Sequence, residues 1–161
     1  MAEFYKEKLR NGLTILFEKR NSSCVASSCA VNEGYSFESE EKKGVSHFLE
    51  HLMFKGTRTR SYKQIAEEIE KKGGILNAYT EEESTCYWNK LPSKHLTSGL
   101  TIAKDLILNP KMAEKDFIRE KTVILEEIKM YHDNPNAYVF DKIKEMLYKK
   151  PFGMAGAGTY E

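Results

Sequence analysis

The sequence predicts an α+β fold in which a mixed, mostly antiparallel sheet has helices packed on one of its faces. Segments with strand-type and helix-type hydrophobic periods come in clusters along the chain, whereas a parallel sheet requires strands and helices in alternation. Asn11-Gly12 lies between two apolar runs, which is a strong signal for an antiparallel hairpin. The 161 residues, 40% of them hydrophobic, form a single predicted domain that is large enough to bury a core.

Five segments have the composition and period of strands. We predict strands at residues 4–10, 13–19, 24–31, 75–80 and 85–91. The first two form the hairpin around Asn11-Gly12. Because apolar residues alternate from Leu13 through Ile15 to Phe17, we expect the second strand to be largely buried. Residues 81–84 connect the last two strands.

Five segments have helical periods and recognisable end signals. Helices are expected at residues 45–55, 62–72, 93–108, 114–131 and 136–148. Ser61 and Gln64 form a capping box at the start of the second helix, and Gly73-Gly74 follow its end. We expect residues 32–43 to form a loop, and the Gly-rich residues 151–161 to form an extended connector.

Composition excludes several classes of function. A net charge of +1 gives no electrostatic reason to expect a nucleic acid or an acidic membrane as partner, and no apolar run is long enough to span a bilayer. The charged start of the sequence does not resemble a secretory signal. Cys24 and Cys29 are expected on opposite faces of one strand as buried, reduced thiols, which fits a reducing compartment. We therefore expect a cytoplasmic protein.

One short helix carries the residues most typical of catalytic chemistry. From residue 45 to 53, His47, Glu50 and His51 share one helical face, and the apolar residues share the other, which we expect to face the core. Two imidazoles at positions i and i+4 can bind one metal ion, and the neighbouring carboxylate can reach a metal-bound water. The pattern H-x-x-E-H is the inverzincin motif and indicates the zinc-binding part of a metallohydrolase.

A third ligand is expected from the helix at residues 114–131. Glu120 and Glu127 are seven residues apart, so they superpose to within about 20° on a helical projection, inside the apolar stripe. Buried carboxylates require a partner, and a metal ion supplies one. We therefore predict Glu127 as the third ligand and Glu120 as a carboxylate that supports a metal-binding histidine from behind. Glu126 falls on the polar face and is expected to be solvated.

Three segments in order resemble the motifs of the M16 metallopeptidases, the family of pitrilysin and mitochondrial processing peptidase. They are residues 47–57, residues 77–87 with Asn77-Ala78-Tyr79-Thr80 at their start, and residues 119–127. The likeness runs from the Asn11-Gly12 hairpin to Gly158-Thr159, and covers part of the family's N-terminal catalytic domain.

The resemblance implies a zinc-dependent endopeptidase that acts on short or unfolded peptides. One Zn²⁺ per chain would be bound by His47, His51 and Glu127, with water in the fourth position, and Glu50 would be the catalytic base. The segment Asn77, Ala78, Tyr79 and Thr80 would be an edge strand that binds the peptide substrate by β-addition.

Family members are usually longer, with two or more homologous domains that close around the peptide. The resemblance therefore implies that residues 1–161 form a single, incomplete metallopeptidase domain. A second M16-type domain or chain, or a homo-oligomer, would complete it.

Two alternatives remain from the sequence. One is a non-hydrolytic structural or assembly subunit of the same fold, although such members usually lose ligands. The other is a small metalloenzyme of the S-ribosylhomocysteine lyase type, which also uses H-x-x-E-H but takes its third ligand from a cysteine. Cys86 is the only downstream cysteine, and it lacks the flanking glycine expected there.

Overall fold

The computed structural model describes residues 3–160 and contains every predicted strand and helix, with ends shifted by a few residues. The strands are β1 (Glu3–Lys8), β2 (Thr14–Lys19), β3 (Cys24–Val31), β4 (Ile75–Thr80) and β5 (Thr85–Pro92). The α-helices are α1 (Val45–Met53), α2 (Tyr62–Glu70), α3 (Leu96–Leu108), α4 (Glu114–Asp133) and α5 (Pro135–Leu147). Short 3₁₀ turns occupy Tyr35–Phe37, Glu40–Lys42 and Ser93–His95.

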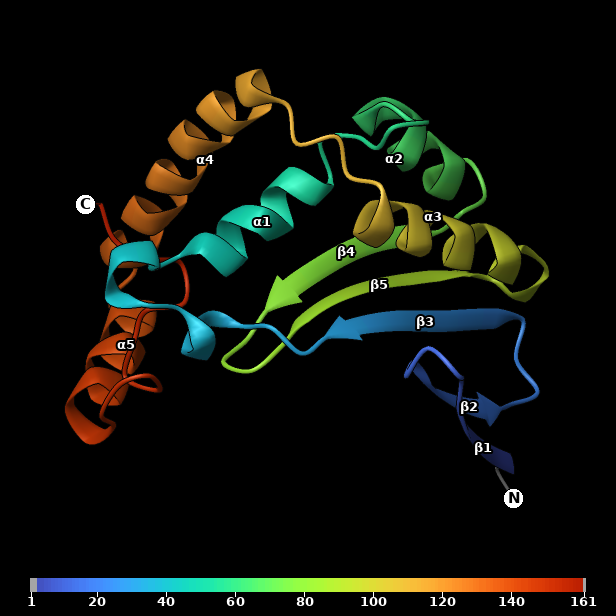
Figure 1. Cartoon of the computed structure of the whole chain (residues 1–161), viewed down its shortest axis with the longest axis horizontal. Helices are drawn as coiled ribbons and strands as arrows, with labels where there is room; N and C mark the ends of the chain where they lie inside the picture. The colour runs from blue at the N-terminus through green and yellow to red at the C-terminus, as the bar shows by residue number, and fades with distance from the viewer. Residues whose placement is uncertain (1–2, 161) are drawn as a thin grey trace.

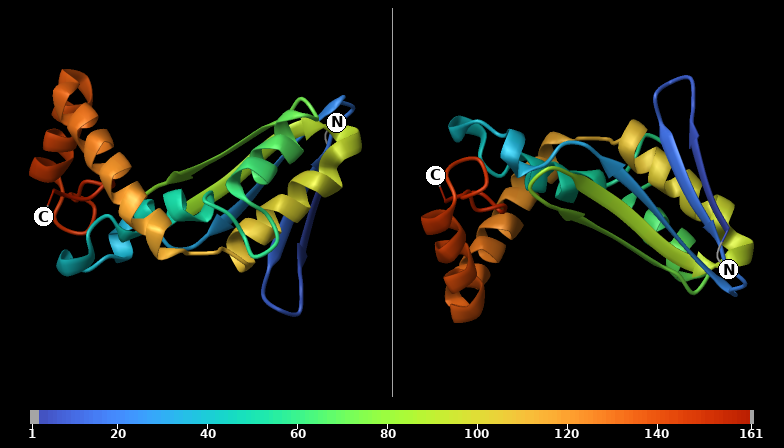
Figure 2. Two further views of the ribbon diagram at one scale, coloured as in Figure 1. Left: turned by 90° about the horizontal axis from the view of Figure 1, so that it is seen from above. Right: turned by 90° about the horizontal axis from the view of Figure 1, so that it is seen from below.

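A three-stranded antiparallel sheet forms the centre of the fold. The strand order is β3-β5-β4, so β4 is an edge strand and β5 pairs on both sides. Helices α1, α2 and α3 lie on one face of this sheet, as predicted, and the views in Figure 2 show the strands uncovered on the other side. Helices α4 and α5 lie beside one end of the sheet, where α4 packs along α1 (Figure 1).

The hydrophobic core lies between the sheet and helices α2 and α3. Its fully buried members are Ile65 and Ile69 of α2, Ile102 and Leu106 of α3, and Leu91 of β5. Each such side chain contributes about 1.5–3 kcal/mol on burial. The capping box predicted at Ser61 is present, because the Gln64 N–H donates to the Ser61 hydroxyl and the Ser61 N–H donates to the Gln64 side chain.

The N-terminal hairpin differs from the prediction in its burial. Strands β1 and β2 pair only with each other and form a separate two-stranded sheet at the side of the molecule (Figure 1). The expected buried strand is exposed: Leu16 keeps 74% of its accessible surface, and Ile15 and Phe17 are also exposed. Alternating apolar residues predict a strand with one apolar face. They do not specify that another element of the same chain buries that face.

The apolar stripe of α1 is also less buried than predicted. Leu52 is buried, whereas Val45 and Leu49 are exposed at 40% and 38%. The physical reason is the place of α1, which crosses the edge strand β4 and has its histidine face turned toward α4. The face that carries the ionisable residues is therefore at least as enclosed as the apolar one.

Two smaller expectations are corrected. Residues 151–160 form turns rather than an extended connector, because Met154 is buried and Gly158 lies against Gly44 at the start of α1. All three cysteines are free as expected, but Cys24 is exposed, since it begins the edge strand β3; Cys86 is buried. None of the helices in residues 3–160 has the length and apolar composition needed to cross a bilayer.

Candidate metal centre

The start of helix α1 is fixed by a carboxylate from the preceding loop. Glu38 accepts hydrogen bonds from the backbone N–H groups of Gly44 and Ser46, at 2.6 and 2.7 Å. These donors are unpaired at the helix N-terminus, so a carboxylate there satisfies them and also interacts favourably with the helix dipole. Gly44 has a left-handed φ of 84°, and a side chain on it would collide with Gly158.

The structure brings together the three predicted metal-binding residues. Ligand atoms of His47 and His51 on α1 and of Glu127 on α4 all lie within 4.8 Å of one another. Glu127 Oε2 is 3.3 Å from His51 Nε2 and 3.9 Å from His47 Nε2. Glu126, one residue away, points to solvent.

These distances fit a zinc ion. Zinc bonds of about 2.0–2.2 Å in a tetrahedral arrangement place ligand atoms roughly 3.4 Å apart. The two nitrogens and the oxygen are close to that separation, and the three side chains are partly buried, with 15–23% of their surface exposed. The donor set of two imidazoles and one carboxylate, with a remaining open side, is typical of catalytic zinc sites.

A buried carboxylate lies behind His51. Glu120 of α4 is only 1% exposed, and its Oε2 atom is 3.3 Å from His51 Nδ1. Lys55 supplies the opposite charge, with its Nζ atom 2.8 Å from Glu120 Oε1. This arrangement favours the His51 tautomer with hydrogen on Nδ1, which leaves Nε2 free to bind a metal.

The second histidine has a different environment. The Nδ1 atom of His47 is buried and has no hydrogen-bond partner within residues 3–160. Burial lowers the pKa of His47, and the positive charge of a protonated His51 lowers it further, although Glu127 and Glu50 oppose the shift. A lowered pKa keeps the imidazole neutral near pH 7, which is the form that binds metals.

The predicted base is held by a residue whose role the sequence did not indicate. The hydroxyl of Thr80, at the end of β4, donates a hydrogen bond of 2.6 Å to Oε2 of Glu50. The prediction placed Thr80 only in the peptide-binding strand. Nothing in the local pattern joins two residues 30 positions apart, so this contact required the tertiary structure.

The other predicted substrate-binding residues lie on the edge strand. Asn77 and Tyr79 are exposed, and Ala78 is partly covered. The backbone N–H of Ala78 donates a hydrogen bond to Oδ1 of Asn77 at 2.9 Å. A carbonyl oxygen of an added strand could take the place of this side-chain acceptor. Along β4, Leu76 packs against the core under α2 and α3 and Thr80 contacts α1, whereas the alternate residues Asn77 and Tyr79 are exposed.

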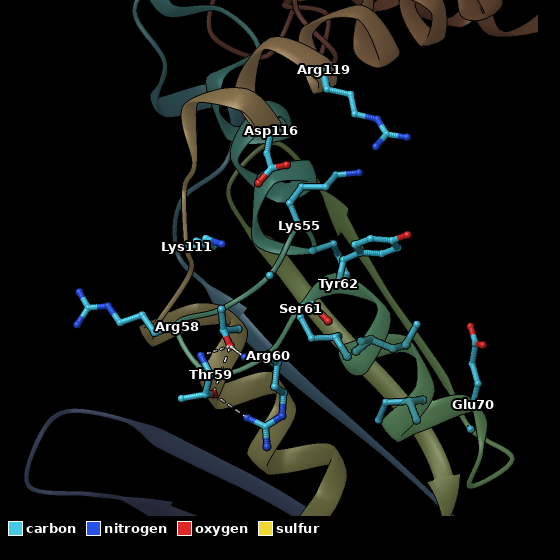
Figure 3. A pocket seen from close by; sticks show the side chains of 18 of the residues that line it. Lys55, Arg58, Thr59, Arg60, Ser61, Tyr62, Glu70, Lys111, Asp116 and Arg119 are labelled. Carbon is cyan, nitrogen blue, oxygen red and sulfur yellow. Dashed lines mark hydrogen bonds between the residues drawn. The ribbon is translucent and has the colours of Figure 1, made fainter.

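A groove continues from the end of α1 to the beginning of β4. It has a volume of about 840 Å³ and lies between α2, the start of α4 and the segment after α1 (Figure 3). Its wall includes the core residues Ile65 and Ile69 and the first residues of β4, Ile75 and Leu76. The groove thus runs from Lys55, which pairs with the Glu120 carboxylate behind His51, to the far end of the edge strand.

The segment that leaves α1 is clamped at the base of this groove. Asp105 of α3 accepts hydrogen bonds from Thr57 and Thr59 and from Arg60, at 2.7, 3.0 and 2.7 Å. Burial alone would raise the pKa of Asp105, but the hydrogen bonds outweigh it and lower the pKa to about 2. Arg60 also pairs with Glu68 of α2.

The chain matches known proteins over nearly its whole length. Residues 14–159 match the family model described as insulinase, peptidase family M16. The chain is 40% identical over 158 residues to an uncharacterized zinc protease of Rickettsia bellii. This match covers 97% of this chain and 38% of that protein. It is 38% identical over 141 residues to the mitochondrial-processing peptidase subunit beta of Rattus norvegicus, which covers 88% of this chain and 29% of that protein.

A solved structure shares the fold. The crystal structure of a protease from Helicobacter pylori superposes with a TM-score of 0.88 at 23% sequence identity. The match covers 99% of this chain and 39% of that one. The chain therefore spans about two fifths, or less, of the length of these relatives.

Proposed function

The chain belongs to the M16 insulinase family of peptidases, and from that premise we propose that it forms the zinc-binding, catalytic part of an endopeptidase for short or unfolded peptides. The observation that carries the proposal is the group of His47, His51 and Glu127 ligand atoms, with Glu50 on the same helix as the two histidines. All four residues match the family motif identified in the sequence, and the relatives from Rickettsia bear the name zinc protease.

In this function His47, His51 and Glu127 would hold one zinc ion. A bound zinc ion lowers the pKa of a coordinated water to about 7 and polarises a peptide carbonyl. Glu50 takes the proton from the attacking water and returns it to the amine that leaves. The Thr80 hydrogen bond supports this role, because it fixes one carboxylate oxygen of Glu50 and leaves the other for the proton.

The peptide is proposed to bind as an added strand along β4. The segment Asn77, Ala78, Tyr79 and Thr80 is at the free edge of the sheet, and its last residue touches the proposed base. Main-chain pairing of this kind accepts many side chains, which suits a peptidase that acts on unfolded chains.

Full activity is proposed to require a second M16-type domain or chain, or another copy of this one. The relatives are more than twice as long as the matched region, and one of them is named as a subunit of a larger enzyme. A non-hydrolytic assembly subunit remains the second candidate. The lyase alternative is excluded, because the chain is an M16 member and Cys86 is buried in β5, outside the candidate metal group. The cytoplasmic location stays a prediction.

Metal analysis and peptide cleavage test the proposal together. We expect the purified chain to bind about one equivalent of Zn²⁺, which chelation removes. The Glu50→Gln variant is expected to retain zinc and to lose at least about a hundredfold in cleavage of an unstructured peptide, since general-base catalysis is worth 10²–10⁴-fold.

The cleavage assay is run with the chain alone and with a separately produced C-terminal half of a full-length relative. Equal cleavage by wild type and Glu50→Gln would remove Glu50 as the base. Stoichiometric zinc without cleavage in any arm would favour the non-hydrolytic alternative.

A further inference from the structure

The groove beside the metal centre has an unbalanced charge. Six cationic and two carboxylate side chains line it, and two of the cations are already paired within the protein, Lys55 with Glu120 and Arg60 with Asp105. The remaining four cations form no ion pair within residues 3–160; they are Arg58, Lys111, Lys115 and Arg119. The two carboxylates, Glu70 and Asp116, offset only half of this charge.

The cationic side chains do not all face the same way. Figure 3 shows the side chains of Lys55, Tyr62 and Arg119 extending to the same side of the groove, with Arg119 at the end near Lys55 and Glu70 at the other end. Ile75 and Leu76 of the edge strand β4 line the same groove. Arg58 extends to the opposite side. Arg119 is also exposed, so its guanidinium is available to a ligand that lies along β4.

The position of the groove along β4 defines which part of a peptide it can contact. Thr80 touches Glu50 at one end of the strand, and Ile75 lines the groove at the other end. Five residues of strand span roughly 17 Å. Antiparallel addition is the more stable pairing and continues the antiparallel sheet, so the peptide would run from Thr80 toward Ile75. The groove then receives residues on the C-terminal side of the cleaved bond.

We propose that this groove selects peptides that carry acidic side chains on the C-terminal side of the cleaved bond, and that Arg119 is the main contact. The inference rests on the proposed function, because it takes β4 as the peptide-binding strand. It adds a preference that main-chain pairing alone cannot supply. Guanidinium groups bind carboxylates with two parallel hydrogen bonds, which favours Arg119 over the lysines as the selective residue.

The expected preference is modest and depends on salt. Because exposed ion pairs are weak, an acidic pair that meets Arg119 and Lys115 should bind only about fivefold tighter than a neutral pair. Because these charges are exposed, the preference should shrink at high ionic strength.

Two labelled peptides of identical composition and net charge provide the test. One has an acidic pair in its C-terminal third, and the other has the same pair in its N-terminal third. Their dissociation constants are measured by fluorescence anisotropy on the zinc-loaded Glu50→Gln protein, so that cleavage does not interfere. The same measurements are made on Arg119→Glu and Arg58→Glu, each added to Glu50→Gln; Arg58→Glu is the matched control because it makes the same change on the opposite side of the groove.

We expect the peptide with the C-terminal acidic pair to bind about fivefold tighter. Arg119→Glu should abolish the difference, and Arg58→Glu should preserve it. Equal binding of the two peptides, or tighter binding of the N-terminal version, would overturn the inference and leave the proposed function intact. Loss of the preference in both variants would remove Arg119 as its source. If neither peptide binds, the assignment of β4 as the peptide-binding strand fails.

Discussion

At the scale of single residues, the metal centre depends on which of two adjacent glutamates faces the histidines. Glu127 Oε2 lies 3.3 Å from His51 Nε2, whereas Glu126 is exposed on the other side of α4. Substituting Glu127 by Gln should therefore weaken zinc binding by at least about a hundredfold, because a carboxylate ligand is lost. Glu126→Gln is the matched control and should bind zinc like the wild type. Competition with a chromogenic chelator measures both affinities, and zinc loss in Glu126→Gln alone would reverse the assignment.

Thr80 provides a second prediction at this scale. Thr80→Val removes the donor that holds Glu50 but keeps the shape of the side chain. Since a hydrogen bond to a charged group is worth about 1.5–3 kcal/mol, we expect kcat for peptide cleavage to fall by about tenfold or more, with zinc content unchanged. Thr80→Ser retains the hydroxyl and should remain active. An unchanged kcat in Thr80→Val would show that Glu50 is oriented by other means.

The residues that could be predicted from the sequence are those related by helical geometry. The relation of His47 to His51, and of Glu120 to Glu127, follows from the helical repeat, which holds in any tertiary context. The contacts of Thr80 with Glu50 and of Glu38 with the start of α1 join separate elements. No periodic pattern encodes such pairs, so they could not be predicted.

At the scale of elements, helix α1 is held at both ends by carboxylates. Glu38 caps its start, and Asp105 clamps the segment that follows its end. Substituting Asp105 by Asn weakens the contacts with Thr57 and Arg60. We expect the free energy of unfolding at pH 7 to fall by about 2 kcal/mol, because hydrogen bonds to a charged group are lost while Arg60 keeps Glu68 as a partner.

The same variant tests the pH dependence of stability. The pKa of Asp105 is about 2 in the folded protein, below its ordinary value of 3.8. The folded state therefore binds this proton less readily than the unfolded state, so the stabilisation is present above about pH 4 and is lost as the pH falls toward 2. In urea titrations, the difference between wild type and Asp105→Asn should shrink over this range. Asp133→Asn, at an exposed site, is the control; a difference that stays constant from pH 7 to pH 3 would contradict the prediction.

The element boundaries were predictable because local chemistry specifies them. The Ser61 capping box appears where the sequence signal is, and α5 begins at Pro135, one residue before its predicted start. Burial was less predictable. The apolar faces of β2 and α1 have the same patterns as covered faces, and the pattern does not say which element covers them.

At the scale of the whole molecule, the candidate site and the N-terminal hairpin lie at opposite ends (Figure 1). The site is built from α1, α4 and the end of β4, and the hydrophobic core lies under α2 and α3. In the hairpin β1 pairs with β2, with Glu3 opposite Lys19 at one end and Lys8 opposite Thr14 at the other. Its large side chains, among them Phe4 and Leu16, are mostly exposed.

A truncation follows from this separation. Removal of residues 1–20 deletes a hairpin whose apolar side chains are already exposed, so it leaves no cavity in the core formed by Ile65, Ile102 and their neighbours. We expect the truncated chain to bind zinc with an affinity within about twofold of the full chain and to lose less than about 1 kcal/mol of unfolding free energy, the effect typical of a surface change. Removing exposed apolar side chains should also reduce aggregation, measured by light scattering. A large loss of zinc affinity on truncation would mean that the hairpin stabilises the arrangement of α1 and α4. The hairpin and the metal centre would then not be structurally independent.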